Sequence, residues 1–551
     1  MTGSRSFRDS DVVDFVVVGS GASGGVLARE LSRSGFDVVV MEQGVRYAPA
    51  QFVHDEYKNF YGYGLTNDPA RCPQSFRKTP ADQAKYSAGQ QVLLYARTVG
   101  GSSVHFTANY WRFHEIDFRE RSALGEISGT GFADWPIDYA ELEPYYSKVD
   151  WEVGVSGLAG SSPFDPPRSR PYPMPPVPVK SSGVLLERGA RKLGLHPFPA
   201  PLAIASQPYR GRSPCVHCGF CMGYGCEVRA KSSSLYTVIP EAEATGRCEI
   251  RTESYVHRVG MDARNRASGV HYFDASRRER FQKAKAVVLA ANGAETPRLL
   301  LNSESSRHPH GLANSSGLVG KYLMFNQGGE VVAQFEHELN EYKSVQVTRV
   351  VHDFYSSDPK RGFYGGGGID GRLGPYPAFW AYANAPSDAW WGAGFKAFLK
   401  DFPRTMVCYC HATSLARADN SVSLDPELKD AWGIPAIRCT YKDHPDDLAT
   451  ARFLQDRAVE ILDAAGARRV WKNSVNESNF AVHLLGTCRM GDDPARSVVD
   501  RFHRTHDVRN LFLCDGSSFV TSGRGQPTMT IQALAFRAAD HIARAAKAGE
   551  I

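Results

Sequence analysis

The sequence contains no apolar run long enough to cross a bilayer as a helix, for which about 20 consecutive apolar residues are needed. It also has no block of lysine or arginine and no internal repeat, and its net charge of +5 is small for 551 residues. The absence of a basic block excludes the charged surface that is typical of nucleic-acid binding. We therefore expect a globular protein with two domains, no transmembrane segment and no nucleic-acid partner.

The first thirteen residues also lack the features of a secretory signal. They are polar and charged, without a basic flank, a continuous apolar core or a small-residue cleavage site. A cytoplasmic protein is the expectation. Export or membrane association through a partner subunit that carries its own signal is the alternative, because it would leave no trace in this chain.

Cysteine is scarce outside one segment. The chain has 11 cysteines, and scattered ones such as Cys408, Cys410 and Cys439 are expected to be small buried hydrophobic residues. Four others are close together, at Cys215, Cys218, Cys221 and Cys226. Their spacing is similar to that of ferredoxin loops, whose thiolates surround an iron–sulfur cluster, although no proline follows the last cysteine. A zinc site and a metal-free loop are the alternatives.

The N-terminal region predicts a strand, a glycine turn, a helix and a second strand. Residues 14–18 and 38–41 are short runs rich in β-branched residues, with apolar residues at helical spacing between them. The residues expected to contact a dinucleotide are Gly19, Gly21, Gly24 and Glu42. The glycines allow, in that order, a tight turn, close approach to a pyrophosphate and close helix–strand packing, and the acid accepts hydrogen bonds from ribose hydroxyls.

The middle of the chain carries fewer chemical signals. The proline-rich residues 163–178 predict a surface excursion between domains. Residues 287–291 predict a strand, followed by a helix that begins after Pro297. The four glycines at 365–368 predict a hinge or loop. The aromatic residues between 376 and 398 are interpreted as packed core or a lid, in preference to a surface that stacks on sugars or docks a partner.

Short motifs elsewhere complete the pattern. Residues 100–103, Gly-Gly-Ser-Ser, form a turn whose amides can approach a flat ring. His483 begins the motif HLLGTCRMG, a predicted strand at 511–513 runs into Asp515 and Gly516, and Pro527 opens the last helix. Together with the glycine fingerprint, these segments resemble the glucose-methanol-choline (GMC) oxidoreductase family, in its order and over nearly the whole chain.

The resemblance implies an α/β fold (α+β overall). A Rossmann-like FAD-binding domain, formed by residues 1–160, 213–325 and 476–551, is expected to be interleaved with a substrate-binding domain. The substrate-binding domain would comprise residues 161–212 and 326–475 and be built on a mixed or antiparallel sheet. The implied cofactor is FAD.

Roles for individual residues follow from the same resemblance. The residues implied to bind FAD are Gly19, Gly21, Gly24, Glu42, Gly100, Gly101, Ser102, Ser103, His105, Asp515 and Gly516. The catalytic residues are His483, which takes the proton of the substrate hydroxyl while hydride leaves for the flavin, and Gln526. Neutral imidazole is a suitable base near neutral pH.

Two positions have open interpretations. The family usually has His or Asn where this chain has Gln526; glutamine keeps the amide but is one methylene longer, so the position of its amide relative to the hydroxyl is open. His105 lies at the spacing at which some members bond histidine covalently to the flavin, and we predict such a bond. A histidine that only packs against the ring is the alternative.

The function implied by the resemblance is that of an FAD-dependent dehydrogenase. It would oxidise a CH–OH group of a sugar, polyol or alcohol and pass electrons to a non-NAD acceptor. In sugar dehydrogenases of this family a cluster near the cysteine segment relays electrons, so a small accessory subunit or a cytochrome is the expected partner. An oxygen-using oxidase, a flavin-containing lyase and a non-catalytic electron-transfer subunit are the alternatives.

Overall fold

The computed structural model describes residues 5–89, 91–373 and 376–551; Met1 to Ser4, at the start of the predicted FAD-binding domain, lie outside this range. Its α-helices are α1 Ala22–Arg33, α2 Glu120–Leu124, α3 Tyr139–Val149, α4 Ser181–Lys192, α5 Val238–Glu243, α6 Asn292–Asn302, α7 Pro377–Asn384, α8 Gly392–Lys400, α9 Pro445–Ala464 and α10 Thr528–Lys547. Its strands are β1 Val13–Val18, β2 Val38–Met41, β3 Gln74–Arg77, β4 Lys85–Tyr86, β5 Phe198–Pro199, β6 Cys248–Arg251, β7 Tyr255–Met261, β8 Ala267–Phe273, β9 Glu279–Leu289, β10 Gly328–Gln334, β11 Arg349–Val351, β12 Gly367–Arg372, β13 Thr405–Ala412, β14 Ser421–Lys429, β15 Pro435–Thr440, β16 Arg469–Lys472 and β17 Leu511–Leu513. None of the described helices is long and apolar enough to cross a membrane.

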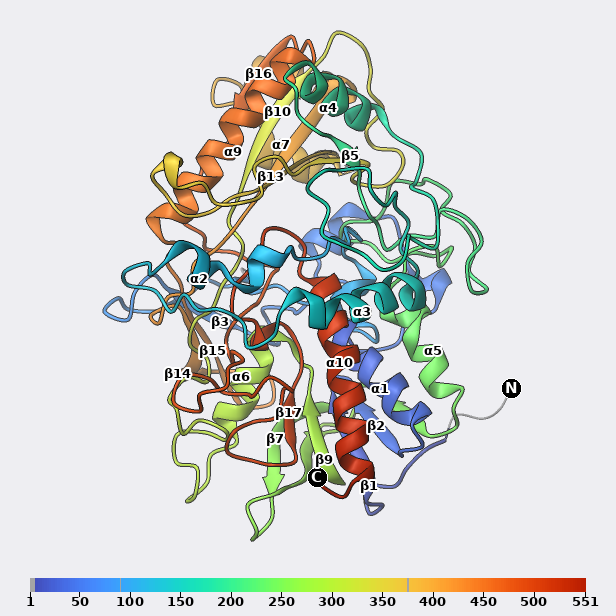
Figure 1. Ribbon diagram of the computed structural model, residues 1–551, viewed down its shortest axis with the longest axis vertical. Helices are drawn as coiled ribbons and strands as arrows, with labels where there is room; N and C mark the ends of the chain where they lie inside the picture. The colour runs from blue at the N-terminus through green and yellow to red at the C-terminus, as the bar shows by residue number, and fades with distance from the viewer. Residues whose placement is uncertain (1–4, 90, 374–375) are drawn as a thin grey trace.

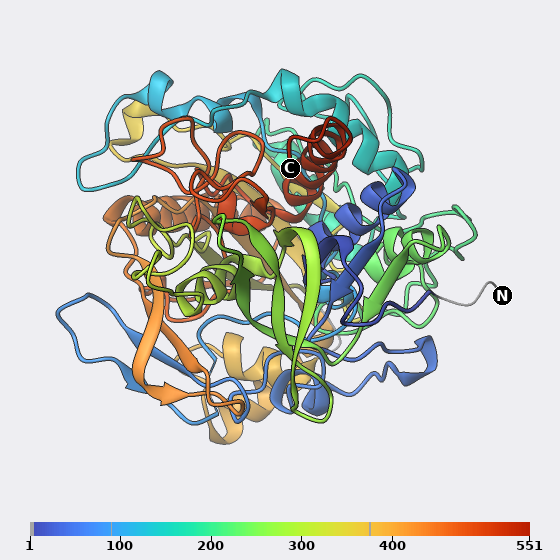
Figure 2. The ribbon, with the colours of Figure 1, turned by 90° about the horizontal axis from the view of Figure 1, so that it is seen from below.

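The predicted Rossmann-like unit is confirmed. Strands β6, β2, β1 and β9 are parallel neighbours in that order, and β17 pairs in parallel with β9. Strand β1 is fully buried at Val16 and Val17, as its run of β-branched residues predicts. Helices α1 and α10, which come from opposite ends of the chain, lie side by side next to this sheet (Figures 1 and 2). The two ends of the sequence therefore build one layer.

A second sheet has the antiparallel character expected of a substrate domain. Its order is β16-β10-β13-β12-β11-β5, and its described pairs are antiparallel. Helix α9 packs Leu454, Ala458 and Ile461 against one face of this sheet, in the upper half of Figure 1. The other face is turned toward the first sheet's domain, which leaves it free to line a site.

A third sheet joins parts of the chain that the predicted boundaries separate. Its order is β14-β15-β3-β4, so residues 74–86, expected in the FAD-binding domain, pair with residues 421–440 of the expected substrate domain. Gly19 and Gly21 of the glycine fingerprint, and residues of the C-terminal segment from His483 to Pro527, line a cavity next to the first sheet, as expected of the FAD-binding domain. The residue boundaries of the domains stay a prediction.

The helix expected after Pro297 starts earlier, at Asn292. The side-chain oxygen of Asn292 accepts hydrogen bonds from the backbone N–H groups of Ala294 and Glu295. Pro297 cannot donate to the carbonyl of Gly293 one turn back, and that carbonyl accepts a hydrogen bond from Thr487 Oγ1 at 2.7 Å instead. A tertiary contact therefore lets the helix run through its proline.

The predicted hinge or loop at 365–368 is correct only for its first two glycines, because Gly367 and Gly368 begin strand β12 and are buried. A Cβ atom on Gly367 would lie 1.7 Å from the carbonyl oxygen of His411, and one on Gly368 would lie 2.7 Å from the His352 ring. Glycine is needed here because neighbouring groups approach the backbone closely.

Part of the aromatic segment is core, as interpreted from the sequence, and Tyr376, Phe379 and Trp380 also line the cavity described below. Tyr376, Trp380 and Phe398 are buried in one hydrophobic cluster. Trp390 and Trp391 are not, with exposed fractions of 61% and 86%. The proline-rich residues 163–178 contain no helix or regular strand, as predicted, and Cys408, Cys410 and Cys439 are buried and free, also as predicted.

Candidate cofactor and active site

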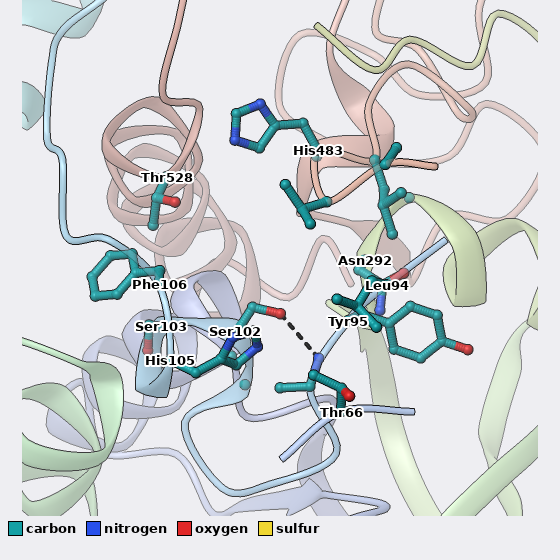
Figure 3. Close-up of a pocket in the computed structure, with 18 of the residues that line it drawn as sticks. Thr66, Leu94, Tyr95, Ser102, Ser103, His105, Phe106, Asn292, His483 and Thr528 are labelled. Carbon is teal, nitrogen blue, oxygen red and sulfur yellow. Dashed lines mark hydrogen bonds between the residues drawn. The ribbon is translucent and has the colours of Figure 1, made fainter. Parts of the chain in front are cut away.

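A cavity of about 1060 Å³ lies between the first two sheets. Its size is at the upper end of the range of ligand pockets, about 300–1,000 Å³. The predicted site residues that line it are Gly19, Gly21, Glu42, Gly101, Ser102, Ser103, His105, His483, Asp515, Gly516 and Gln526. Gly24, Gly100 and the four clustered cysteines are not part of the lining. In Figure 3, His483 lies across the cavity from Ser102 and His105.

The glycines form a bare backbone surface on one side of the cavity. Gly101, with φ +56°, faces Gly21 so closely that a Cβ atom on Gly101 would lie 2.6 Å from the Gly21 Cα. Gly24 does what the sequence predicts, because a Cβ there would lie 1.9 Å from the carbonyl oxygen of Gly19. No described side chain caps the first turn of α1, so its amides are available to an anion in the cavity.

Glu42 ties the two glycine segments together. Its Oε2 accepts hydrogen bonds from the Ser20 backbone N–H at 3.1 Å and from the Ser20 hydroxyl, and its Oε1 accepts from Gly44 N–H. The Ser20 hydroxyl oxygen in turn accepts from Gly100 N–H at 3.1 Å. Burial raises the pKa of Glu42, and these hydrogen bonds oppose the shift. Glu42 thus organises the turn in addition to any contact with a ribose.

Asp515 has a similar organising role at the start of helix α6. Its Oδ2 accepts from Asn292 N–H at 3.0 Å and from the Thr296 hydroxyl at 2.6 Å, and its Oδ1 accepts from Ser517 N–H at 2.8 Å. The carboxylate therefore fixes the start of α6 against the loop that follows β17.

His105 is positioned at the end of the turn that contains Ser102 and Ser103. Burial, and then the nearby Lys231 cation, lower its pKa to about 4, so the ring is neutral at neutral pH. Its Nε2 is buried and has no hydrogen-bond partner among the described residues. An unpaired imidazole nitrogen is costly unless a group bound in the cavity engages it.

His483 has a defined tautomer. Its Nδ1 lies 3.1 Å from the side-chain oxygen of Asn326. The amide nitrogen of Asn326 donates to backbone carbonyls, the shortest contact being 3.1 Å to Gly523, which fixes the oxygen toward the histidine. Nδ1 must then carry the proton, and Nε2 keeps its lone pair. The Gln526 side chain also interacts with the His483 ring, and this interaction opposes the lowering of the His483 pKa. The structure therefore brings the two predicted catalytic residues together.

The segment that carries Gln526 is held by a buried ionic network. The Arg524 guanidinium forms ion pairs with Asp117 and Glu120, all of them fully buried. The hydroxyl of Tyr355 also donates to Asp117, at 2.5 Å. This network links the loop before α10 to the start of α2 and to the loop between β11 and β12, so several buried contacts hold the segment that carries Gln526.

Several polar residues of the cavity were not found from the sequence. The second sheet contributes Glu330, Arg372, Tyr409 and His411, and the segment before it contributes Asn326. The alternation of Val407, Tyr409 and His411 along β13 was the one signal of a strand with a face toward a site. No short motif connects residues that lie on three different strands.

The four cysteines do not form a ligand set in this structure. Among the described residues, no group of three or more His, Cys, Asp or Glu side chains is arranged to hold a metal ion. The sulfur of Cys215 accepts a hydrogen bond from His217 N–H at 3.4 Å, and Met222 and Gly223, from the same segment, line the cavity. The segment thus adjoins the site.

Known proteins were compared with the chain over its full length. The GMC oxidoreductase family models match residues 13–326 and 416–535. The chain belongs to this family. Similar relatives include 2-methyl-1,2-propanediol dehydrogenase of Mycolicibacterium austroafricanum, 35% identical over 97% of this chain and 96% of that protein. The fructose dehydrogenase large subunit of Gluconobacter japonicus is 30% identical over 97% and 98%. The fold is that of Aspergillus oryzae formate oxidase, whose R554A variant superposes with a TM-score of 0.69 at 15% identity, covering 99% of this chain and 100% of that one.

Membership of the GMC family makes the chain a flavoprotein oxidoreductase, and the cavity fits FAD. The uncapped start of α1 suits a pyrophosphate, and the contact of Gly21 with Gly101 leaves a strip without side chains along the cavity. Glu42 follows β2 and lines the cavity, at the position where an acidic residue hydrogen-bonds the ribose hydroxyls in dinucleotide-binding folds.

In this GMC oxidoreductase we expect activity to persist in mild acid. Burial, and then the nearby His411 and Arg372, lower the pKa of His483 to about 4. With His483 as the base that we propose below, the deprotonated ring is the active form. The kcat/KM should then be constant from neutral pH to about pH 5 and fall about tenfold per pH unit below about pH 4. A pH profile with one substrate, with circular dichroism recorded at each pH, checks this. An acidic limb near pH 6.5 would contradict it.

Proposed function

We propose that the protein is an FAD-dependent dehydrogenase that oxidises a CH–OH group of an alcohol, polyol or sugar, with His483 as the proton acceptor. One observation carries the proposal. The His483 imidazole, whose Nδ1 lies 3.1 Å from the Asn326 side-chain oxygen, lies in a cavity that continues into a dinucleotide-type glycine surface. The proposed proton acceptor and the glycine surface thus line the same cavity.

Each residue of the site would have a defined role in the oxidation. Bound FAD supplies the hydride acceptor. Nε2 of His483 takes the hydroxyl proton, while Asn326 holds the ring in the tautomer that leaves Nε2 free. Gln526, which contacts the same ring, is placed to fix the hydroxyl or the imidazole. Proton transfer to a positioned base contributes about 10²- to 10⁴-fold in rate.

The names of the two relatives support a dehydrogenase. One is named for a diol and the other for a sugar. The second is called a large subunit, which supports a small accessory subunit or a cytochrome as the electron acceptor of this chain as well. We propose such a partner and no use of NAD.

Anaerobic mixing of the purified flavoprotein with a panel of alcohols, polyols and sugars tests the proposed function. We expect the flavin absorption to bleach with at least one of them. In air, turnover with an artificial acceptor dye but without hydrogen peroxide supports a dehydrogenase, whereas stoichiometric peroxide would show an oxidase. A flavin that no alcohol or sugar bleaches would contradict oxidoreductase chemistry on these donors.

We also propose a covalent bond between His105 and FAD. The support is the buried Nε2 without a partner and the neutral state of the ring. After acid precipitation, the yellow colour should stay in the protein pellet of the wild type and move to the supernatant for His105→Ala. Colour that leaves the wild-type pellet would contradict the bond.

An iron–sulfur cluster at Cys215, Cys218, Cys221 and Cys226 is a separate proposal. It rests on the sequence spacing and on the amide hydrogen bond to the Cys215 sulfur, an interaction that tunes cluster sulfurs. Among the described residues, the four sulfurs are not gathered into one ligand set. Iron and acid-labile sulfide assayed on the same sample test the proposal, and zinc or no metal would contradict it.

A further inference from the structure

The face of the second sheet that borders the cavity is polar. Strands β10, β13 and β12 are adjacent, and their register places Glu330, Tyr409 and Asp370 opposite one another in one row. Residues directly opposite in an antiparallel sheet share a face. Arg372 and His411, two positions along their strands from this row, lie on the same face. All but Asp370 line the cavity.

The positive charge on this face is already neutralised. Asp370, fully buried, accepts a hydrogen bond from Arg372 Nε at 2.7 Å and lies 2.9 Å from His411 Nε2. These partners, chiefly Arg372, hold the pKa of Asp370 at about 2 despite burial. Burial lowers the pKa of His411, and the nearby Asp370 carboxylate opposes this shift. Arg372 therefore has its carboxylate partner within the protein and does not need one from a substrate.

Glu330 is the residue of this face that still has a carboxylate oxygen available for a hydrogen bond. Its Oε2 accepts a hydrogen bond from Asn473 Nδ2 at 2.9 Å, and no described residue hydrogen-bonds its Oε1. Burial raises its pKa. The guanidinium carbon of Arg372 lies 4.4 Å from the centroid of the neighbouring Tyr409 ring. This stacking holds the phenol in place beside Glu330. A carboxyl group and a phenol side by side are suited to bind a hydroxyl group.

The same face borders the proposed base. Asn326, which is hydrogen-bonded to His483, also donates to the carbonyl oxygen of Ala412 at the end of β13, at 3.4 Å. His483 lines the same cavity as His411 and Arg372. A substrate whose reacting hydroxyl is at His483 would therefore have its neighbouring carbon atoms next to the sheet face.

We propose that Glu330 and Tyr409 form a subsite for a second hydroxyl group of the substrate, so that the enzyme prefers uncharged molecules with two or more hydroxyls over simple alcohols and over hydroxy acids. The inference rests on the proposed function and narrows its substrate class. A hydroxy acid is disfavoured because its carboxylate would meet two carboxyl groups and a guanidinium that is already paired.

Three matched compounds test the subsite in the purified flavoprotein with an artificial acceptor: propane-1,2-diol, propan-1-ol and 3-hydroxypropanoate. The wild type should show a kcat/KM for the diol at least about tenfold above that for either of the others, since a site built for a hydroxyl rejects an analogue that lacks it. Glu330→Leu should lower kcat/KM for the diol about 10- to 100-fold and leave that for propan-1-ol within about threefold.

Two further variants separate the loss of hydroxyl binding at the subsite from a general disruption of the fold. Glu330→Gln keeps polar atoms at the site and should retain more of the preference for the diol than Glu330→Leu, and Tyr409→Phe should lose part of it. Glu336→Leu, at an exposed position just beyond the same strand, is the matched control and should leave the preference unchanged. FAD content and thermal unfolding of each variant show whether the fold is kept.

The outcomes distinguish the inference from the proposed function. Equal use of propan-1-ol and the diol by the wild type, or equal losses for both in Glu330→Leu, would overturn the subsite and leave the dehydrogenase intact. A wild-type flavin that none of the alcohols or sugars reduces would overturn the proposed function itself.

Discussion

Replacing His483 by alanine should lower the rate of flavin reduction by an alcohol about 10²- to 10⁴-fold, the usual contribution of a positioned base. The structure gives the reason, since Nε2 of His483 is the unprotonated nitrogen of a ring fixed by Asn326. Substrate affinity should change much less, because the base acts mainly in the transition state. Anaerobic stopped-flow measurement of flavin bleaching separates the two effects.

This prediction has two controls, a substitution of another histidine and a measurement of FAD content. His310→Ala removes an exposed histidine outside the cavity and should keep the wild-type rate. The FAD content of His483→Ala should match the wild type, because the glycine surface is unchanged. A variant that retains more than about a tenth of the wild-type rate would show that another group, or hydroxide, removes the proton.

The FAD side of the site could be predicted from the sequence because its signals are local. Gly19, Gly21 and Gly24 are needed within one turn, where backbone geometry and close packing leave no room for a side chain. Such a pattern is readable from a few consecutive residues, and the strands on both sides followed from their β-branched runs.

The substrate side could not be predicted, because its residues meet only through the pairing of distant strands. Glu330, Arg372 and Tyr409 come from β10, β12 and β13, and each alone is an ordinary polar residue in a strand. The same holds for α6, whose start was misplaced because the hydrogen bond that Pro297 forgoes is replaced by Thr487, nearly 200 residues away in the sequence. Tertiary contacts of this kind override local rules.

The binding of FAD should depend on Gly101 more sharply than on any cap or surface residue. Gly101→Ala places a Cβ atom 2.6 Å from the Gly21 Cα, a backbone contact that no rotamer change can relieve. The dinucleotide turn or the segment from Gly101 to Ser103 must then move, and both line the cavity. We expect the purified variant to contain less than about a tenth of the FAD found in the wild type.

Gly129→Ala is the matched control for this substitution. Gly129 also has a positive φ, +75°, but a Cβ atom there would meet nothing within 4 Å. Both variants therefore carry the backbone strain of alanine in the left-handed region, about 1 kcal/mol, and only Gly101→Ala carries the clash. Equal FAD contents in the two variants would mean that strain, and not the approach of Gly101 to Gly21, limits binding. A large difference would place the cofactor against the surface that the two glycines form.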